Sequence, residues 1–131
     1  SDMSRINLTD DNDMIAQKLR KAKTDPEPLP SDAAGLAGRP EAINLVGIYA
    51  TMIGSTPDAV CAQFAGQGFG AFKPALADLL IEKLAPIRQR YTALRADHDA
   101  LDAILASGAE KASAAAEPTL RGAYEAMGLM R

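Results

Sequence analysis

Apolar residues recur at alternating spacings of three and four between Ala71 and Ala96, and this pattern constrains the fold more than any other feature of the chain. The spacing places them on one face of an α-helix about seven turns long. The seam consists of Phe72, Leu76, Leu79 or Leu80, Leu84, Ile87, Tyr91 and Leu94. Pro74 falls near the first turn, where a missing N–H is tolerated, whereas Pro86 lies inside the segment and predicts a kink. The segment favours an all-α fold.

Two segments are predicted before the first loop. Residues 1–9 form a short extended arm, in which Ile6 and Leu8 alternate with polar residues. Thr9 or Asp10 then caps a helix that ends near Lys23. The apolar stripe of this helix consists of Met14, Ile15, Leu19 and Ala22.

Residues 25–40 are rich in proline and glycine, which predicts a loop of about 15 residues that is functional or mobile. A helix over residues 41–53 follows, with Gly54 as its stop, and it buries Ile43, Val46, Ile48 and Tyr49. Ser55 and Asp58 match an S-x-x-D capping box for a short helix to Phe64. The next segment, G-Q-G-F-G, has the glycines of a phosphate loop but lacks a preceding strand and a G-K-[ST] ending, so it indicates a connector.

The C-terminal part is predicted as two helices. Asp97 caps a short one that carries Leu101 and Leu105, and an S-x-x-E box at Ser107 opens the last one, which ends at Gly128. Pro118 predicts a bend or break in the last helix. The whole is an all-α helical bundle of about five to six helices, with residues 10–131 as one helical domain behind the arm.

Composition narrows the function classes. The chain has 131 residues, 47% of them hydrophobic and 24% charged, which is typical of one globular domain. No apolar run reaches the roughly 20 residues of a membrane span, so a cytoplasmic location is expected. One cysteine and one histidine do not make a zinc site. The net charge of −3 argues against RNA binding through bulk charge, so any RNA contact relies on local basic patches.

Two stretches resemble bacterial tryptophanyl-tRNA synthetases. The first reads S-x-I-x-L-x-D, then an isoleucine and a lysine on a helix, then a basic run closing with A-x-T-D, which matches Ser4, Ile6, Leu8, Asp10, Ile15, Lys18, Ala22, Thr24 and Asp25. The second is G-A-E-K-A at 108–112, followed by Thr119, Leu120, Tyr124 and Gly128. Pro118 departs from the family pattern. The resemblance covers residues 4–131 and places the chain directly behind the K-M-S-K-S loop of such an enzyme.

The resemblance implies a division of labour. The HIGH-type and K-M-S-K-S motifs do not occur in this sequence, so no catalytic residue is expected here. ATP and magnesium are expected only in the parent enzyme, a homodimer whose other domain activates tryptophan. The expected partners are that nucleotide-binding domain and the tryptophan tRNA, whose anticodon stem and loop the helical domain binds. The arm and Met14 are expected to pack against the missing domain, and without it to leave an apolar patch that is exposed or covered by a neighbouring chain.

Candidate RNA contacts follow from the same resemblance and from charge. The lysine of the G-A-x-K-A motif is Lys111, and Arg121 follows it by almost three helical turns if the helix is continuous. Further candidates are the basic residues of two clusters, Arg88, Arg90 and Arg95 on the long helix and Lys18 and Lys21 on the first. Charge near a helix C-terminus also has a simpler explanation, because it complements the helix dipole and faces solvent.

Other interpretations compete with this one. A helical protein-interaction module without an RNA role would explain the acidic balance and the long seam, and a tyrosyl-tRNA synthetase domain is the nearest alternative within the enzyme class. Cys61 and His98 could form a nucleophile and base, but Cys61 is better explained as a small core residue and His98 as a surface residue. Asp10, Asp11 and Asp13 lack the pattern of a calcium loop and suit a helix start.

Overall fold

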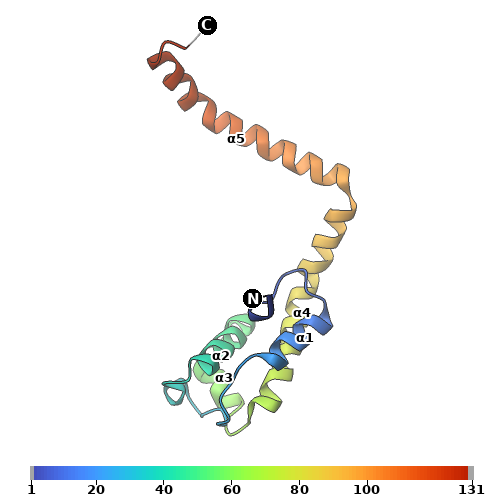
Figure 1. Cartoon of the computed structure of the whole chain (residues 1–131), viewed down its shortest axis with the longest axis vertical. Helices are drawn as coiled ribbons and strands as arrows, with labels where there is room; N and C mark the ends of the chain where they lie inside the picture. The colour runs from blue at the N-terminus through green and yellow to red at the C-terminus, as the bar shows by residue number, and fades with distance from the viewer. Residues whose placement is uncertain (1, 130–131) are drawn as a thin grey trace. The chain divides into compact units, whose positions relative to one another are not determined.

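The computed structural model describes residues 2–129 and, within them, contains helices and no strand. The α-helices are α1 (Asn12–Lys21), α2 (Pro40–Ile53), α3 (Pro57–Gln63), α4 (Phe69–Ala96) and α5 (His98–Ala126) (Figure 1). Two 3₁₀ turns, η1 (Asp2–Ser4) and η2 (Ala33–Leu36), lie in the connecting segments. The predicted all-α class is confirmed. Ser1 of the predicted arm and residues 130–131 lie outside the described residues.

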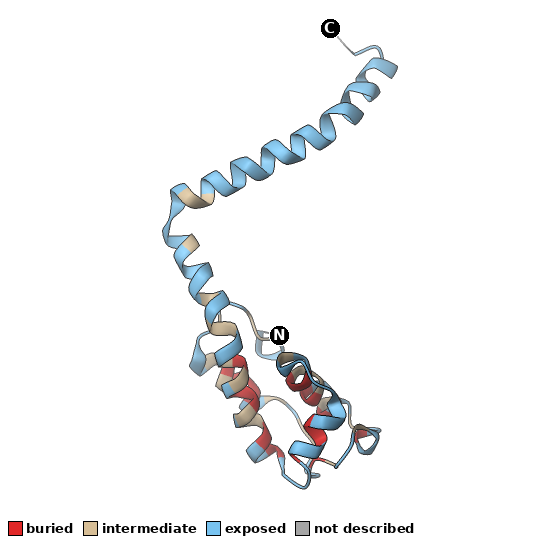
Figure 2. Cartoon of the chain, turned by 180° about the vertical axis from the view of Figure 1, so that it is seen from behind, coloured by how far each residue is buried: buried red, intermediate tan, exposed pale blue. Residues whose placement is uncertain are grey.

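The chain forms two compact units, Ser1–Gln89 and Arg90–Arg131, and the boundary between them lies inside α4. The first unit contains a core to which α1, α2, α3 and the first part of α4 all contribute. In the second unit no residue of the range 90–129 is buried, as the uninterrupted pale colour along most of α5 shows (Figure 2). The first unit is therefore stabilised by a buried apolar core, and residues 90–129 of the second unit have no such core.

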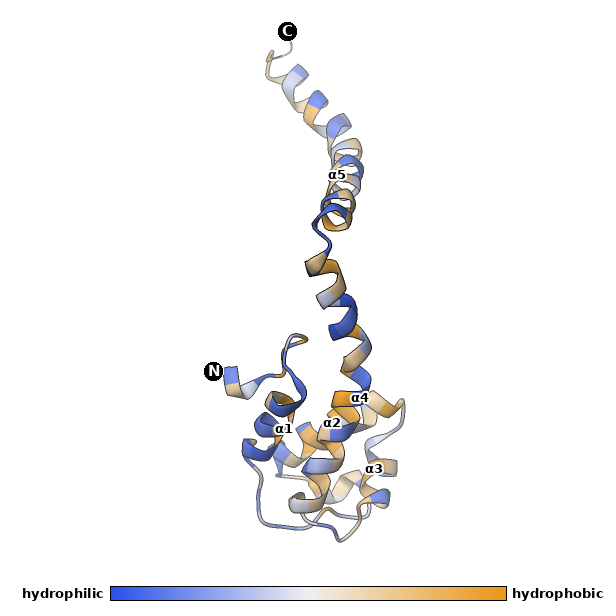
Figure 3. Ribbon diagram, turned by 90° about the vertical axis from the view of Figure 1, so that its right-hand side faces the viewer, coloured by the Kyte–Doolittle hydropathy of each residue, from blue (hydrophilic) through white to orange (hydrophobic). Residues whose placement is uncertain are grey.

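Four aromatic rings lie at the centre of the first unit. The Phe64 and Phe72 rings meet edge to face with centroids 4.9 Å apart, and Tyr49 lies 5.3 Å from Phe64. Phe69 packs against Phe72 from the start of α4, with centroids 6.2 Å apart. Edge-to-face contacts of this kind add to the free energy gained from burial. The apolar residues of α2 and the adjoining part of α4 appear orange in Figure 3.

The proline-rich loop is part of this core. Leu29 and Leu36 are buried, and the backbone of Leu29 exchanges hydrogen bonds with Gln67 and Gly66 at 2.9 and 2.8 Å. Arg39 holds the two ends of the loop together, since its guanidinium binds both carboxylate oxygens of Asp25 at 2.7 and 3.0 Å. The guanidinium also donates to the carbonyls of residues 27 and 28. A paired fork of this geometry is directional as well as strong, so it fixes Asp25 and Arg39, at the two ends of the loop, relative to each other.

Helix α1 starts later than predicted. Its N-cap is Asp11, whose Oδ1 accepts a hydrogen bond from the backbone of Met14 at 2.7 Å. Neither Thr9 nor Asp10 caps it, because the Asp10 carboxylate is occupied by Lys18 and by the backbone of Asn7. The predicted stripe is confirmed at its centre, where Ile15 and Leu19 are buried.

The N-terminal segment differs from an extended arm. It begins with the 3₁₀ turn η1. Ile6 packs against the core of its own unit, so the prediction that it contributes to an exposed patch is wrong. Leu8 is 53% exposed, as that prediction required.

Helices α2 and α3 correct two further expectations. The buried face of α2 consists of Ala42, Leu45, Val46, Tyr49 and Ala50. Ile43 lies outside it and is exposed, because it falls about 100° around the helix from Ala42. The cap of α3 is Thr56, which accepts from Ala59 at 3.3 Å, and Asp58 instead accepts from the backbone of Ala33 at 2.8 Å. Gly54 ends α2 at φ +66°, as predicted.

The two long helices pass through their prolines. Helix α4 is continuous across Pro74 and Pro86, but its buried seam stops at Leu80, and Ile87 and Tyr91 are exposed. Helix α5 is likewise a single element across Pro118, capped by Asp97, so of the bend or break predicted there the break does not occur. Each proline removes one backbone hydrogen bond, which an exposed helix can replace with water. The described residues include no single helix long and apolar enough to cross a membrane, although the bent pair α2 and α3 together meet that length and composition.

Candidate nucleic-acid interface

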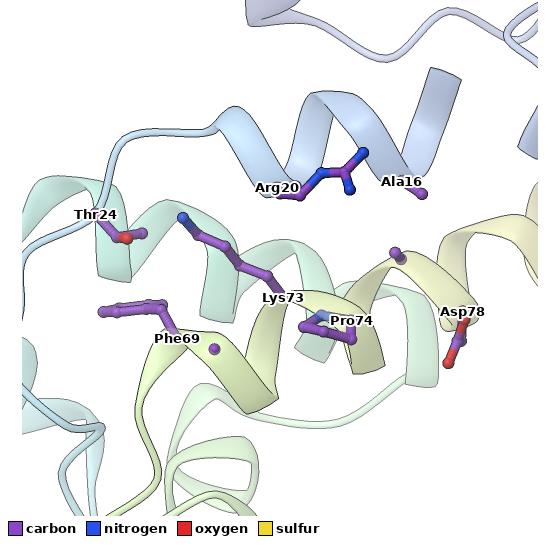
Figure 4. Close-up of a pocket in the computed structure, with 9 residues that line it drawn as sticks. Ala16, Arg20, Thr24, Phe69, Lys73, Pro74 and Asp78 are labelled. Carbon is purple, nitrogen blue, oxygen red and sulfur yellow. The ribbon is translucent and has the colours of Figure 1, made fainter. Parts of the chain in front are cut away.

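The C-terminal end of α1 and the start of α4 border a groove of about 590 Å³ in the first unit (Figure 4). Its lining consists of Ala16, Arg20, Thr24, Phe69, Gly70, Lys73, Pro74, Ala77 and Asp78. Lys73 donates from Nζ to the carbonyl of Ala22 at 2.7 Å, which satisfies a free acceptor at the end of α1. Figure 4 shows the Lys73 ammonium directed toward Thr24, with Asp78 at the far end of the groove.

Lys18, one of the predicted RNA contacts, is 3% exposed. Its Nζ lies 2.7 Å from Oδ2 of Asp10 and 3.2 Å from Oδ2 of Asp2. The hydrogen bond from Lys18 lowers the pKa of the Asp10 carboxyl, and the same bond raises the pKa of Lys18. Lys18 therefore holds the N-terminal segment onto α1 and is not available to a phosphate. Lys21, the other candidate on this helix, is exposed.

Arg88 also has an internal role. Its guanidinium donates to the carbonyl of Asp10 at 2.8 Å and to Oδ1 of Asn12 at 2.6 Å. These two bonds attach the start of α1 to α4 within the first unit. Arg88 is therefore a structural contact between two helices, and we do not retain it as an RNA contact.

The remaining predicted contacts lie in the second unit. Arg90, Arg95 and Lys111 are exposed, and within residues 2–129 they form no ion pair. Arg121 pairs with Glu117 at 3.4 Å on the surface of α5. Lys111 and Arg121 stand on one continuous helix, about 15 Å apart along its axis and about 80° apart around it. They therefore occupy neighbouring faces of α5.

The charge of α5 is unfavourable for bulk attraction of RNA. Besides Lys111 and Arg121 the helix carries five acidic residues, Asp99, Asp102, Glu110, Glu117 and Glu125. Only short-range contacts from individual basic side chains remain as a means of binding phosphates there.

Cys61 and His98 lie in different units. Cys61 is fully buried on α3, and burial raises the pKa of its thiol, which confirms that it is a core residue. His98 is the exposed first residue of α5. The part of the chain that the structure describes contains no cluster of three or more side chains suited to a metal ion.

Two residues with long-range contacts in the structure, Lys73 and Arg39, were not predicted from the sequence. Lys73 stands alone beside a proline at a helix start, and nothing in its local pattern indicates that it meets the end of α1. Arg39 lies between a glycine and a proline in the loop, and its partner Asp25 is 14 residues away. Both contacts join residues that are distant in the chain, so local sequence patterns do not indicate them.

Comparison with known proteins identifies the family. No family model matches the chain. It is 60% identical over 120 residues to a tryptophan–tRNA ligase of Caulobacter vibrioides, a match that covers 92% of the chain. The chain belongs to the tryptophan–tRNA ligase family. A tryptophan–tRNA ligase of Mesorhizobium japonicum is 52% identical over 131 residues, all of the chain, and the chloroplastic/mitochondrial one of Arabidopsis thaliana is 42% identical over 98% of it.

The match spans only part of these relatives. The chain covers 35% of the length of the Caulobacter tryptophan–tRNA ligase and 37% of the Mesorhizobium one. The names of the relatives support the resemblance found in the two motifs and favour tryptophan–tRNA ligases over the tyrosyl alternative.

Proposed function

We propose that the chain is the C-terminal part of a tryptophan–tRNA ligase and that it contributes to binding the anticodon stem and loop of the tryptophan tRNA. In this proposal the whole enzyme joins tryptophan to its tRNA at the expense of ATP, and residues 1–131 do not activate tryptophan alone. The observation that carries the proposal is the identity of 60% to a tryptophan–tRNA ligase over nearly the whole chain.

Exposed basic side chains support an RNA contact. Arg90, Arg95, Lys111 and Lys21 are free of ion pairs among the described residues, and Arg121 has only an exposed partner. Contacts between arginine or lysine side chains and phosphate oxygens supply a large share of the affinity of protein–nucleic acid complexes. With a net charge of −3, the contact depends on where these side chains stand rather than on the field of the whole protein.

The test is binding of a labelled anticodon stem–loop of the tryptophan tRNA, measured by fluorescence anisotropy over a range of salt. We expect the affinity to fall as salt rises, with a slope set by the number of phosphates that the protein neutralises. No binding at about 50 mM salt, where electrostatic contacts are least screened, would overturn the proposal.

A matched pair of variants tests the site. Lys111→Ala should weaken binding several-fold and reduce the salt slope by about one phosphate contact. Lys83→Ala removes the same charge from an exposed lysine outside the proposed contacts and should leave binding unchanged. Equal affinities of the two variants would remove Lys111 from the interface.

The division of labour has its own measurement. ATP–pyrophosphate exchange with tryptophan should be absent from the 131-residue chain, because the sequence contains neither the HIGH-type nor the K-M-S-K-S motif. Measurable exchange would show that the chain holds an adenylate site.

One observation favours a second function, contact with another protein surface. Helix α5 has no buried residue, although it carries the large apolar residues Ile104, Leu105, Leu120 and Tyr124. Apolar side chains that join into one exposed patch are typical of an interaction site. Hydrogen exchange of the α5 amides should be slower in the full-length ligase than in the isolated chain, and equal rates would argue against this function.

A further inference from the structure

The groove between α1 and α4 in the first unit contains two cations that the internal ion pairs of the protein do not use. Lys18, Lys23 and Arg39 each have a carboxylate partner at 2.7 to 3.0 Å. Arg20 and Lys73, which line the groove, have no carboxylate within ion-pair distance among the described residues. Their charges are therefore uncompensated at short range.

Helix capping accounts for only part of this arrangement. Lys73 gives one hydrogen bond to the carbonyl of Ala22, and an ammonium has two further donors. Arg20 makes no comparable bond to any residue that the structure describes, although it stands in the last turn of α1, where the helix dipole favours a cation. Asp78 is the acidic residue of the lining, and it lies at the end of the groove away from Thr24 (Figure 4).

The arrangement suits an extended polyanion better than a small anion. In Figure 4 the Arg20 guanidinium and the Lys73 ammonium extend to different parts of the groove and do not converge on one point. A single phosphate would need convergent donors, whereas successive phosphates of a strand can meet cations spaced along a surface. The volume of about 590 Å³ lies in the range of sites that hold a ligand of nucleotide size.

We propose that this groove holds the phosphodiester backbone of an RNA strand, with Arg20 and Lys73 contacting successive phosphates. The inference rests on the proposed tRNA-binding function and adds a site on the first unit, separate from the candidates on α5. Thr24 supplies a hydroxyl at the same end as Lys73, and Phe69 and Pro74 supply apolar walls for the sugar.

The test compares two double variants of the full chain by fluorescence anisotropy with the labelled anticodon stem–loop. Arg20→Ala/Lys73→Gln should weaken binding about tenfold or more at low salt and reduce the salt slope by about two phosphate contacts. The glutamine keeps an N–H donor for the carbonyl at the end of α1. Arg5→Ala/Lys83→Gln removes the same charge from exposed residues outside the groove and should leave affinity and slope unchanged.

The outcomes separate the two proposals. If the unmodified chain does not bind RNA, the proposed function fails. If it binds and the two double variants have equal affinities, the groove is not a phosphate site and this inference fails. Arg20→Ala alone keeps the test valid if the double variant unfolds, because Arg20 is exposed. If a polyglutamate peptide binds as tightly as the stem–loop and loses as much affinity in the Arg20→Ala/Lys73→Gln variant, the groove is instead a site for an acidic protein segment, and this inference fails.

Discussion

Replacing Leu29 with alanine tests whether the proline-rich loop belongs to the core. Leu29 is 1% exposed, although it stands in a segment whose composition predicts a loop. Its backbone bonds to Gln67 and Gly66 do not involve the side chain, so the substitution removes packing and leaves the hydrogen bonds in place.

The expected loss follows from the buried volume. Leucine to alanine removes three carbons, worth about 2.4 kcal/mol at roughly 0.8 kcal/mol per buried carbon. The cavity that remains adds to this, and partial collapse of the loop subtracts from it, so we expect about 3 kcal/mol less free energy of unfolding. With a slope typical of a small domain, the urea midpoint of the first unit should fall by about 2 M.

The assay is urea unfolding followed by near-ultraviolet circular dichroism. The chain has no tryptophan, and Tyr49 packs in the aromatic cluster of the first unit, so the signal reports on that core. Leu8→Ala is the control, because Leu8 is 53% exposed, and it should change the free energy of unfolding by less than about 0.5 kcal/mol. Superposable unfolding curves for the two variants would refute the claim that the loop is packed.

Three further predictions can be checked on the same protein. Because the hydrogen bond from Lys18 lowers the pKa of Asp10, the ionised carboxylate stabilises the folded protein at pH values above the ordinary pKa of 3.8, and this stabilisation is lost as the pH falls through the lower pKa of the folded state. Asp10→Asn should therefore make the free energy of unfolding depend less on pH in acid. An unchanged pH dependence would contradict the role of Asp10. Gly54→Ala should destabilise the first unit by about 1 kcal/mol, because the backbone φ of Gly54 is +66°. Gly47→Ala should stabilise it by about 0.5 kcal/mol, because Gly47 lies inside α2 and nothing lies near the added Cβ. Thermal unfolding of the two variants measures both effects. The Cys61 thiol should react with a water-soluble disulfide reagent only on unfolding, and fast labelling of the folded protein would contradict its burial.

Local patterns predicted the helices well because the helical period and the stop signals depend on neighbouring residues. Gly54 ends α2, and Asp97 caps α5, as the sequence indicated. Ser107 and Glu110 match a capping box equally well, yet they lie inside α5. A capping box takes effect only where a helix begins, and the four-residue pattern does not show whether the preceding residues are already helical.

The motif residues that indicate the family have structural roles in the first unit. Asp10 and Lys18 pair with each other, and Asp25 pairs with Arg39. The motifs thus identified the family, but these charged motif residues are used in ion pairs within the protein. A short-range ion pair neutralises the charge that an RNA contact would need. The candidates that we retain are therefore those without an ion-pair partner among residues 2–129, such as Lys111.

The all-α class, most helix positions, the burial of Cys61 and the family could be inferred from local patterns, because these depend on periodicity, caps and matched motifs. Which basic side chains are already bound within the protein could be read only from the folded chain. Lys18 and Arg88 are engaged by carboxylate or carbonyl oxygens. Arg20 and Lys73 line an open groove and have no carboxylate partner among the described residues, although Lys73 also donates to the carbonyl of Ala22. The availability of a charged side chain depends on which groups pack within a few ångströms of it, and those contacts join residues that are far apart in the chain.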